Sequence, residues 1–295
     1  MKLVTYNIQF GRGKDEVNDL DRIAREVSGA DIICLQEVDR NWSRSNNVDQ
    51  VEAFKQLFPE YHAEYGPGVN LIADIRDSSG HVVHQRRQFG NMTLSKFPIR
   101  YCRHHLLPKH ASTGPISIQR SALECTIEAE GSFLRLTNTH LTHLSSETRA
   151  PQIQYLLDIH QNAQLEGEPV CGDLEPTYWK LDTALPRPPR NAIIVGDFNC
   201  EPASDNYTAM TGPMSDYGGR IINPDLLMDA WVASGHDEAD GFSSDVDGRS
   251  ARLDHIFLNP DLGEFVTKCW IDEQAQGSDH QPMWMEFSLT GRAHT

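Results

Sequence analysis

Short apolar runs alternate with segments of helical period along most of the chain, and this alternation restricts the possible folds more than any other feature. The first run, KLVTYNI, predicts a strand, and residues 17–28, beginning at Val17, have the apolar spacing of one helix face. Asp31 opens a short, continuously apolar run, as expected of a strand buried on both faces. Strands and helices mixed throughout predict one α/β domain over residues 1–295.

The remaining segments follow the same rhythm, with one exception. We predict further helices at 48–58 and 147–165, and strands at 69–75, 90–95, 120–128, 132–139, 192–196, 252–258, 265–271 and 283–289. Residues 167–190 contain five prolines and no regular period. This stretch predicts a long surface loop, in which Tyr178 and Trp179 pack against the loop itself or contact a partner.

The charge and cysteine content exclude some classes of protein. The net charge is −16 with a pI of about 5.2, and no dense basic run appears, which argues against tight unassisted binding of nucleic acid. Divalent cations can offset that charge, so a nucleic-acid substrate stays open. Six scattered cysteines without a CxxC pair offer neither a zinc site nor a disulfide framework, and we expect reduced thiols in a cytoplasmic protein. We also expect no signal peptide, membrane span or membrane anchor.

Polar side chains stand where apolar runs end. Asn7 ends KLVTYN, Glu37 ends DIICLQE, His140 ends LRLTNTH, Asp197 and Asn199 end AIIVGDFN, Asp254 lies in ARLDHIF, and Asp279 and His280 precede PMWMEF. Each alone is more often a turn residue or a solvated group than a catalyst. Their shared placement predicts that buried strands deliver them into one cleft.

The residue types in this set fit one chemistry. Carboxylates and amides are hard oxygen ligands, which suit Mg²⁺ or Mn²⁺ better than zinc. Two histidines can then bind or protonate a phosphoryl oxygen, while Asp254 orients an imidazole. This combination predicts metal-assisted hydrolysis of a phosphoester.

The motifs TYNIQ, LQEVD, GNMTLSKFPI, NTHL, GDFN, RLDHIF and GSDH, in that order, resemble the endonuclease/exonuclease/phosphatase superfamily. The resemblance runs from Thr5 to His280 and is closest to bacterial members of poorly defined substrate. It implies a four-layer α/β sandwich, in which two mixed β-sheets pack face to face with helices on the outside.

The resemblance also implies a role for each residue. The metal ligands would be Glu37, Asn7 and Asp279. The catalytic residues would be Asp197, which orients the attacking water with the help of Asn199, and His280, which contacts the scissile phosphate and is paired with Asp254. His140 would be a second histidine on the phosphate, and its carboxylate partner is left open. Substrate contacts would come from Arg120, in SIQRSALE, and from Asn91, in GNMTLS.

The stretch that follows the metal glutamate leaves two readings open. Arg40 and Arg44 would hold a second phosphate or a headgroup, because guanidinium forks suit that role, or they form ordinary ion pairs in a surface loop. The NTHL motif extends into the next helix through His143, Arg149 and Gln152. These residues either help the N-terminus of that helix to bind an anion or are ordinary residues of the helix surface.

Three classes of substrate compete for the predicted phosphodiesterase. A nuclease needs basic or aromatic recognition loops, and a lipid phosphodiesterase an exposed apolar hairpin or an anchor. Neither feature is evident in the sequence, so we favour a small-molecule or headgroup phosphoester, with an endo- or exonuclease as the alternative. A non-catalytic scaffold is a further alternative, and no protein partner is predicted.

Overall fold

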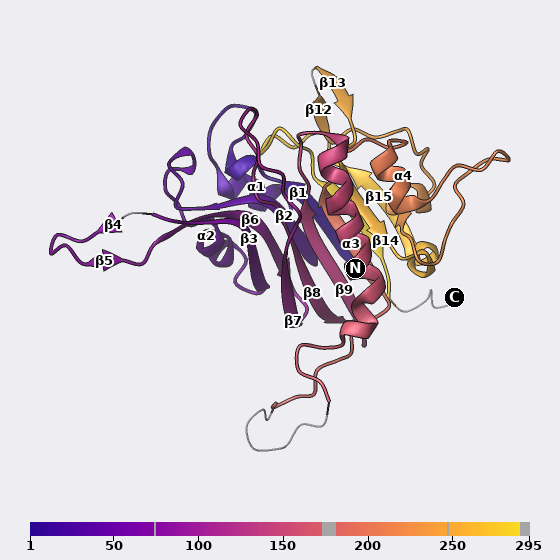
Figure 1. Cartoon of the computed structure of the whole chain (residues 1–295), viewed down its shortest axis with the longest axis horizontal. Coiled ribbons are helices and arrows are strands. Elements are labelled where there is room, and N and C mark those ends of the chain that lie inside the picture. Colours follow the sequence, from indigo (N-terminus) through magenta and orange to yellow (C-terminus); the bar gives the residue numbers. More distant parts are fainter. Residues whose placement is uncertain (74, 173–180, 247, 290–295) are drawn as a thin grey trace.

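Two six-stranded sheets form the centre of the protein, whose computed structural model describes residues 1–73, 75–172, 181–246 and 248–289 (Figure 1). The strands of the first sheet are, in order, β15 (Val266–Ile271), β16 (Met283–Phe287), β1 (Lys2–Asn7), β2 (Ile32–Arg40), β6 (Arg86–Ser95) and β3 (His62–Ile72). Those of the second are β11 (Met228–Asp229), β14 (Asp254–Leu258), β10 (Ala192–Asp197), β9 (Ser132–His140), β8 (Ser121–Ala129) and β7 (Ile99–Leu106). Each sheet is mixed, because β1 and β2, and likewise β9 and β10, run parallel while their other neighbours are antiparallel.

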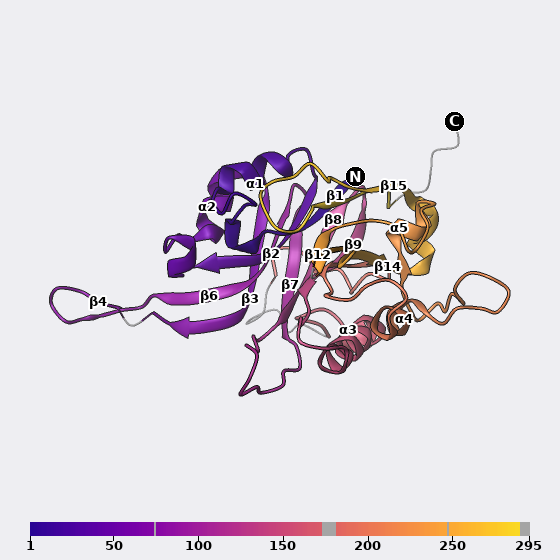
Figure 2. The ribbon, with the colours of Figure 1, turned by 90° about the horizontal axis from the view of Figure 1, so that it is seen from above.

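Helices cover the outer face of each sheet (Figure 2). The first sheet is covered by α1 (Leu20–Glu26) and α2 (Gln50–Leu57), whose Ile23 and Phe54 pack into one cluster with Val4 and Ile33. The second sheet is covered by α3 (Ser146–Glu166) and α4 (Asp205–Thr211). The shorter helices are α5 (Ala230–Ala233), η1 (Gln9–Gly11), η2 (Ser43–Ser45) and η3 (Pro260–Phe265). The predicted sandwich of two mixed sheets between helices is confirmed.

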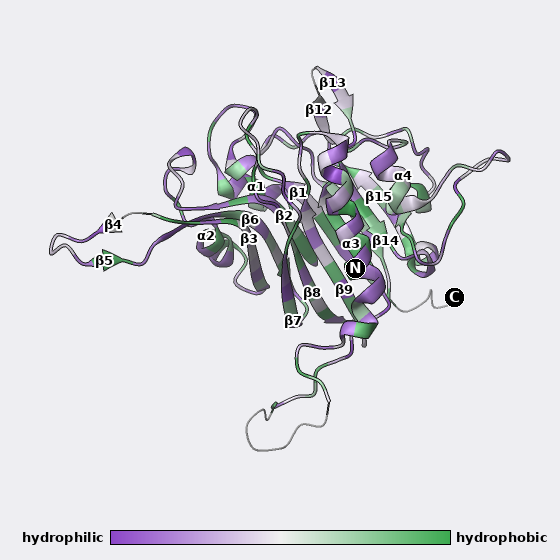
Figure 3. Cartoon of the chain, in the orientation of Figure 1, coloured by the Kyte–Doolittle hydropathy of each residue, from purple (hydrophilic) through white to green (hydrophobic). Residues whose placement is uncertain are grey.

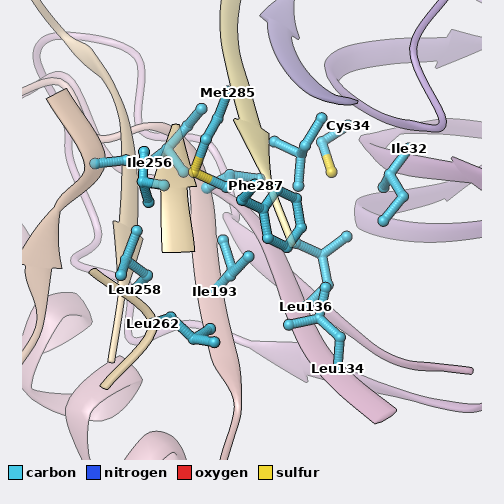
Figure 4. Close-up of a cluster of buried hydrophobic side chains, with 14 of the residues drawn as sticks. Ile32, Cys34, Leu134, Leu136, Ile193, Ile256, Leu258, Leu262, Met285 and Phe287 are labelled. Carbon is cyan, nitrogen blue, oxygen red and sulfur yellow. The ribbon is translucent and has the colours of Figure 1, made fainter. Parts of the chain in front are cut away.

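The inner faces of the sheets bury an apolar layer between them (Figure 4). In each central strand every second residue points into this layer, and the series changes from apolar to polar along the strand. In β9 the series is Leu134, Leu136, Asn138 and His140. The strands β1, β2 and β10 change in the same direction, through Leu3, Thr5 and Asn7, through Ile32, Cys34 and Gln36, and through Ile193, Val195 and Asp197. One end of the layer is therefore hydrophobic core and the other is lined with polar groups.

A buried pair of amides separates the apolar core from that polar end. Gln36 Nε2 donates to Asn138 Oδ1 at 2.7 Å, across the gap between the sheets. Asn138 Nδ2 in turn donates to the carbonyl oxygen of Met92 at 2.9 Å. Because a buried amide is costly unless it is hydrogen-bonded, this network fixes how the two sheets meet.

An arm projects from one end of the first sheet. We use this name for the outer ends of β3 and β6 together with the small strands β4 (Ile75–Arg76) and β5 (Val82–Val83), seen at the left of Figure 1. Leu71, Ile72, Val82 and Val83 are 39–57% exposed on it. This exposed apolar hairpin was not recognised in the sequence. The argument against a lipid substrate that rested on the lack of such a hairpin therefore no longer holds.

Several predicted boundaries differ from the structure. The strand predicted at 69–75 is the end of a longer strand, β3, which begins at His62. The helix predicted at 17–28 begins after Asp19, whose side chain accepts a hydrogen bond from the Arg22 N–H, so Val17 precedes the helix and is 55% exposed. The elements β7, α4 and the hairpin of β12 (Ser244–Val246) and β13 (Arg249–Ala251) were not predicted.

The proline-rich stretch 167–190 is described only in part. Residues 167–172 and 181–190 contain neither helix nor strand, and Tyr178 and Trp179 lie outside the described residues. Arg103 donates to the carbonyl oxygen of Gly167, and Arg100 to that of Ala184.

None of the described helices is long and apolar enough to span a bilayer. Hydropathy follows the same layers, with apolar central strands and a polar outer side of α3 (Figure 3).

The contact between α3 and the second sheet should make stability depend on pH. Burial and the neighbouring Arg135 lower the pKa of His160 to about 4, and Arg135 Nη2 lies 3.2 Å from His160 Nδ1. An unfolded histidine has a pKa of about 6.5, so the unfolded chain takes up the proton first as the pH falls. We therefore expect His160 to contribute stability above pH 6.5 that is lost as the pH falls to 4, by at most about 3 kcal/mol.

Urea unfolding at several pH values tests this expectation. A His160→Gln variant keeps a hydrogen-bond acceptor but cannot titrate, so its free energy of unfolding should fall less steeply than that of the wild type between pH 6.5 and 4. A variant of the exposed His62, His62→Gln, is the control and should follow the wild type. Equal slopes in all three proteins would contradict the assignment.

Candidate active site

The polar end of the inter-sheet layer gathers side chains from both sheets. Asn7 ends β1, His140 ends β9 and Asp197 ends β10. Asp254 begins β14 directly opposite Asp197, its partner in the antiparallel register. Parallel strands end at the same edge of a sheet, and the two sheets stack with these edges together, so residues distant in the sequence meet in one cleft. The structure thus brings together the strand-end residues that the sequence singled out.

Glu37 enters the cleft through an irregularity in β2. The register between β2 and β6 shifts between Leu35 and Val38, and Glu37 adopts a φ of 60°. Positive φ is uncommon for a residue other than glycine, and a bulge of this kind re-aims one side chain. Among the described residues, no hydrogen bond donor reaches the Glu37 carboxylate. Burial raises its pKa, partly offset by Arg120 and His280 and reinforced by Asp197.

Asp197 occupies the centre of the cleft. Its Oδ2 accepts a hydrogen bond from Asn7 Nδ2 at 2.9 Å and lies 3.2 Å from His140 Nε2 and 3.7 Å from His280 Nε2. Its Oδ1 accepts from the backbone N–H of Asn199 at 2.9 Å. Burial raises the pKa of Asp197, and the charge of His280 opposes this rise. Asp197 is therefore a hydrogen-bonded carboxylate that touches both histidines.

His280 and Asp254 form a buried pair. Their Nδ1 and Oδ2 atoms are 2.7 Å apart. Burial alone would lower the pKa of His280, but the charges of Asp254 and Asp197 outweigh it and raise the pKa to about 10. His280 is consequently an imidazolium at neutral pH, with one N–H directed at Asp254 and the other toward the cleft.

His140 is held in the opposite protonation state. Arg120 Nη1 lies 2.9 Å from His140 Nδ1, and because a guanidinium can only donate, Nδ1 is the acceptor and the proton lies on Nε2. Burial, reinforced by the charge of Arg120, lowers the pKa of His140 well below its ordinary value. The carboxylate partner left open by the sequence is Asp197, 3.2 Å from Nε2, while Glu37 Oε1 is 3.9 Å from Nδ1.

Asp279 lies at the rim, although its neighbour His280 is buried. Its Oδ2 accepts from Gln9 Nε2 at 2.8 Å, and its Oδ1 accepts from Ser278 Oγ at 3.1 Å. Its charge contributes to the raised pKa of Glu37, so the two carboxylates face the same space. Gln9 was not recognised in the sequence; its only signal was its position two residues after Asn7.

The predicted substrate contacts lie beside His140. A small hollow is lined by Gly68, Phe89, Gly90, Asn91, Gln119, Arg120, Ser121 and His140. Asn91 Nδ2 donates to the carbonyl oxygen of Ser121 at 2.8 Å, which ties the two sheets together at this point. The second terminal nitrogen of Arg120 lies 3.3 Å from His143 Nδ1. Arg149, by contrast, contacts Asn206, and Gln152 Oε1 accepts from the N–H of Thr142.

Asn199 closes the site on the side of the second sheet. It has a φ of 50°, and its Nδ2 donates to the carbonyl oxygen of Leu141 at 3.0 Å and lies 3.2 Å from His140 Nε2. Its hydrogen bond to Leu141 therefore positions the loop after β10.

The two arginines that follow Glu37 differ in their surroundings. Arg40 is bound by both oxygens of Asp49 and by Gln88 Oε1, the ordinary ion-paired arrangement of a surface loop. Arg44 uses Nε and Nη2 to bind Asp39, at 3.0 and 2.8 Å, and keeps a side chain that is 40% exposed. Only Arg44 contributes to the electrostatics of the cleft, since it lies close enough to Glu37 for the two charges to interact.

The chemistry of these groups fits a divalent cation. Asp197, Asp254 and His280 bring donor atoms within 4.8 Å of one another, which is close enough to hold a metal ion. The proton between His280 and Asp254 already occupies that pair, whereas no hydrogen-bond donor in the described part of the chain reaches the Glu37 carboxylate, whose pKa is raised by burial. Glu37, Asp279 and Asn7, the ligands that the resemblance implies, offer the oxygen atoms that Mg²⁺ and Mn²⁺ prefer.

Comparison with known proteins gives a consistent result. The model of the Endonuclease/Exonuclease/phosphatase family matches residues 4–280. No curated protein sequence matches significantly. Among solved structures, an endonuclease/exonuclease/phosphatase from Beutenbergia cavernae is similar with a TM-score of 0.65 and 21% identity, over 99% of this chain and 72% of that one.

Two further solved structures resemble the chain over nearly its whole length. Truncated TDP2 from Caenorhabditis elegans has a TM-score of 0.57 and 18% identity, and the alignment covers 97% of each chain. A mannosyl-6-phosphatase from Bacteroides thetaiotaomicron has a TM-score of 0.59 and 17% identity, over 98% of this chain and 100% of that one. At these identities the likeness supports the fold.

Proposed function

Because the chain belongs to the Endonuclease/Exonuclease/phosphatase family of phosphoester hydrolases, we propose that it hydrolyses a phosphodiester by in-line attack of water, with Mg²⁺ or Mn²⁺ bound at Glu37. The observation that carries the proposal is the placement of two histidines around one carboxylate, Asp197, with His280 held by Asp254 and His140 by Arg120, contacts that favour a charged His280 and a neutral His140. Two imidazoles in opposite protonation states provide an acid and a hydrogen-bond donor of different strength in the same cleft.

The residues of this chain would divide the work as follows. Asp197, fixed by Asn7 and Asn199, would orient the attacking water and accept its proton. His280, held by Asp254, would donate its proton to the leaving oxygen or stabilise charge on the phosphate. Arg120 would bind a phosphate oxygen next to His140. The bound cation would supply charge neutralisation at the phosphate.

A binding experiment tests the metal site without relying on turnover. Glu37, Asp197 and Asp279 repel one another in the free protein, so Mn²⁺ should bind with a measurable heat and raise the melting temperature. We expect Glu37→Gln to weaken Mn²⁺ binding at least tenfold in calorimetry and to lose most of the thermal shift, because an amide is a poorer ligand than a carboxylate. A matched change at an exposed carboxylate, Glu60→Gln, should leave both unchanged. No Mn²⁺ binding by the wild type would favour a non-catalytic scaffold.

For the substrate we propose a small-molecule or headgroup phosphoester, with a DNA or RNA strand as the alternative. The net charge of −16 supports the first choice, since it disfavours a long polyanion. Phosphate or alcohol release from nucleotides, phosphosugars, lysophospholipids and single-stranded DNA and RNA, measured with Mn²⁺, would separate these classes. Rapid cleavage of oligonucleotides alone would overturn the preference. We also propose that the protein is cytoplasmic.

A further inference from the structure

The cleft continues beyond His140 along one face of β6. Phe89 lies with its ring centroid 6.5 Å from that of His140. It pairs directly with Asp39 of β2, so the two side chains share a face of the sheet. Asn91, two residues along β6, points the same way and reaches the carbonyl oxygen of Ser121 in the other sheet. This face of β6 therefore looks into the cleft.

Arg44 is fixed above Phe89 with one edge free. Its guanidinium carbon lies 4.5 Å from the ring centroid of Phe10, 5.2 Å from that of Trp42 and 5.1 Å from that of Phe89. Asp39 binds Nε and Nη2, while Nη1 has no partner among the described residues. A guanidinium held in this way by rings and a buried carboxylate loses little entropy when its free edge binds an anion.

Arg87 continues the same face outward from Phe89. It lies two residues before Phe89 in β6, so its side chain emerges on the cleft side about 7 Å further out. The side chain is exposed and has neither a hydrogen bond nor an ion pair within the described part of the chain. Its neighbour Arg86 points to the opposite face and is bound to Asn70.

The charge around these arginines is unlike that of the rest of the chain. No Asp or Glu occurs between Asp77 and Glu124, although the protein has a net charge of −16. The Lys and Arg residues in this interval are Arg86, Arg87, Lys96, Arg100, Arg103, Lys109 and Arg120. The strand β6 thus has no carboxylate of its own that would repel an anion.

We propose that Arg44 and Arg87 bind a second anionic group of the substrate, a phosphate that follows the scissile phosphate along the face of Phe89. This inference rests on the proposed function and deepens it, since it specifies a phosphoester that carries at least two phosphates. The second phosphate belongs either to a nucleic-acid strand or to a small bisphosphate. Charge-assisted hydrogen bonds from two guanidinium groups would select such a substrate over the matching one with a single phosphate.

Matched substrates that differ by one phosphate test the proposal. In the nucleotide pair, thymidine 5′-(p-nitrophenyl phosphate) is compared with the same ester carrying a 3′-phosphate. In the sugar pair, the p-nitrophenyl diester of glucose 1-phosphate is compared with the same diester carrying a 6-phosphate. With Mn²⁺ at low salt, we expect kcat/KM to be about tenfold higher for the doubly phosphorylated member of at least one pair, through a lower KM, and the preference to shrink in 0.5 M NaCl. A preference in the nucleotide pair alone identifies a strand, and one in the sugar pair alone a small bisphosphate.

Variants then assign the preference to these side chains. Arg87→Gln and Arg44→Gln should each bring the ratio of the two kcat/KM values close to one. Arg87 is exposed, so its variant should fold even if Arg44→Gln, which leaves Asp39 buried without its partner, does not. Arg86→Gln is the matched control on the opposite face and should keep the wild-type ratio.

The outcomes separate this inference from the function on which it rests. Equal kcat/KM values within both pairs, or an unchanged ratio in Arg87→Gln, would overturn the second phosphate site. Cleavage of the diesters that carry only the scissile phosphate would still support the phosphodiesterase. Cleavage of no ester at all would overturn both.

Discussion

The variant Asp197→Asn is expected to hydrolyse bis-p-nitrophenyl phosphate with a kcat about 10²–10⁴ times lower than that of the wild type, at an unchanged melting temperature within a few degrees. The amide keeps the size of the side chain but cannot accept a proton. It also places an N–H where Oδ2 now lies 3.2 Å from His140 Nε2 and 3.7 Å from His280 Nε2. Both the orientation of water and the acceptor for its proton are therefore lost.

Steady-state kinetics with Mn²⁺ measure this effect, and an exposed carboxylate gives the control. Asp158→Asn on α3 makes the same chemical change away from the cleft and should retain wild-type kcat. If Asp197→Asn remained within threefold of the wild type, Asp197 would not act in the chemical step.

The second large effect concerns the buried pair of His280 and Asp254. In the metal-free protein we expect nuclear magnetic resonance to report a pKa of about 10 for the His280 ring. In Asp254→Asn the strongest source of the rise is removed while burial, which lowers the pKa, remains, so the value should fall by three units or more, to below neutral pH. Activity should fall by about 10²–10³ at neutral pH, since a neutral His280 cannot donate a proton.

The raised pKa of His280 also predicts how the free energy of unfolding changes with pH, which can be measured on the same samples. The folded pKa of His280 lies above the unfolded value of about 6.5, so its contribution to stability is complete below pH 6.5 and is lost as the pH rises toward 10. Asp254→Asn should flatten the fall in stability over this interval, and Asp261→Asn, at an exposed position, should not. A measured His280 pKa near 6.5 in the wild-type protein would contradict the prediction, because His280 and Asp254 would then not form a stable ion pair.

The sequence predicted which residues meet because strand ends carry a clear pattern. In LRLTNTH and AIIVGDFN the apolar alternation stops at a polar residue, and parallel neighbours must stop at the same edge. The arrangement of the two sheets followed from the resemblance of the motifs, not from their spacing. Both the sandwich and the gathering of Asn7, Asp197 and Asp254 agree with that expectation.

What the sequence could not predict depends on long-range contacts of side chains. Whether Arg40 or Arg44 faces the cleft is decided by their carboxylate partners, Asp49 and Asp39, and both pairs look alike in sequence. The neutral state of His140 requires Arg120, which lies on another strand. The strands β4 and β5 of the arm were missed because each has only two residues and so shows no apolar alternation, on which the prediction depended.

The conformation of Glu37 makes the cleft a place where folding and activity favour different residues. A φ of 60° and a partly buried carboxylate that no hydrogen-bond donor among the described residues reaches each destabilise the fold, the backbone term by about 1–3 kcal/mol. Glycine or asparagine would adopt this φ more readily and would bring no charge into the cleft. Laboratory evolution for heat resistance alone should therefore drift away from glutamate at this position, and only a simultaneous selection for turnover would retain it.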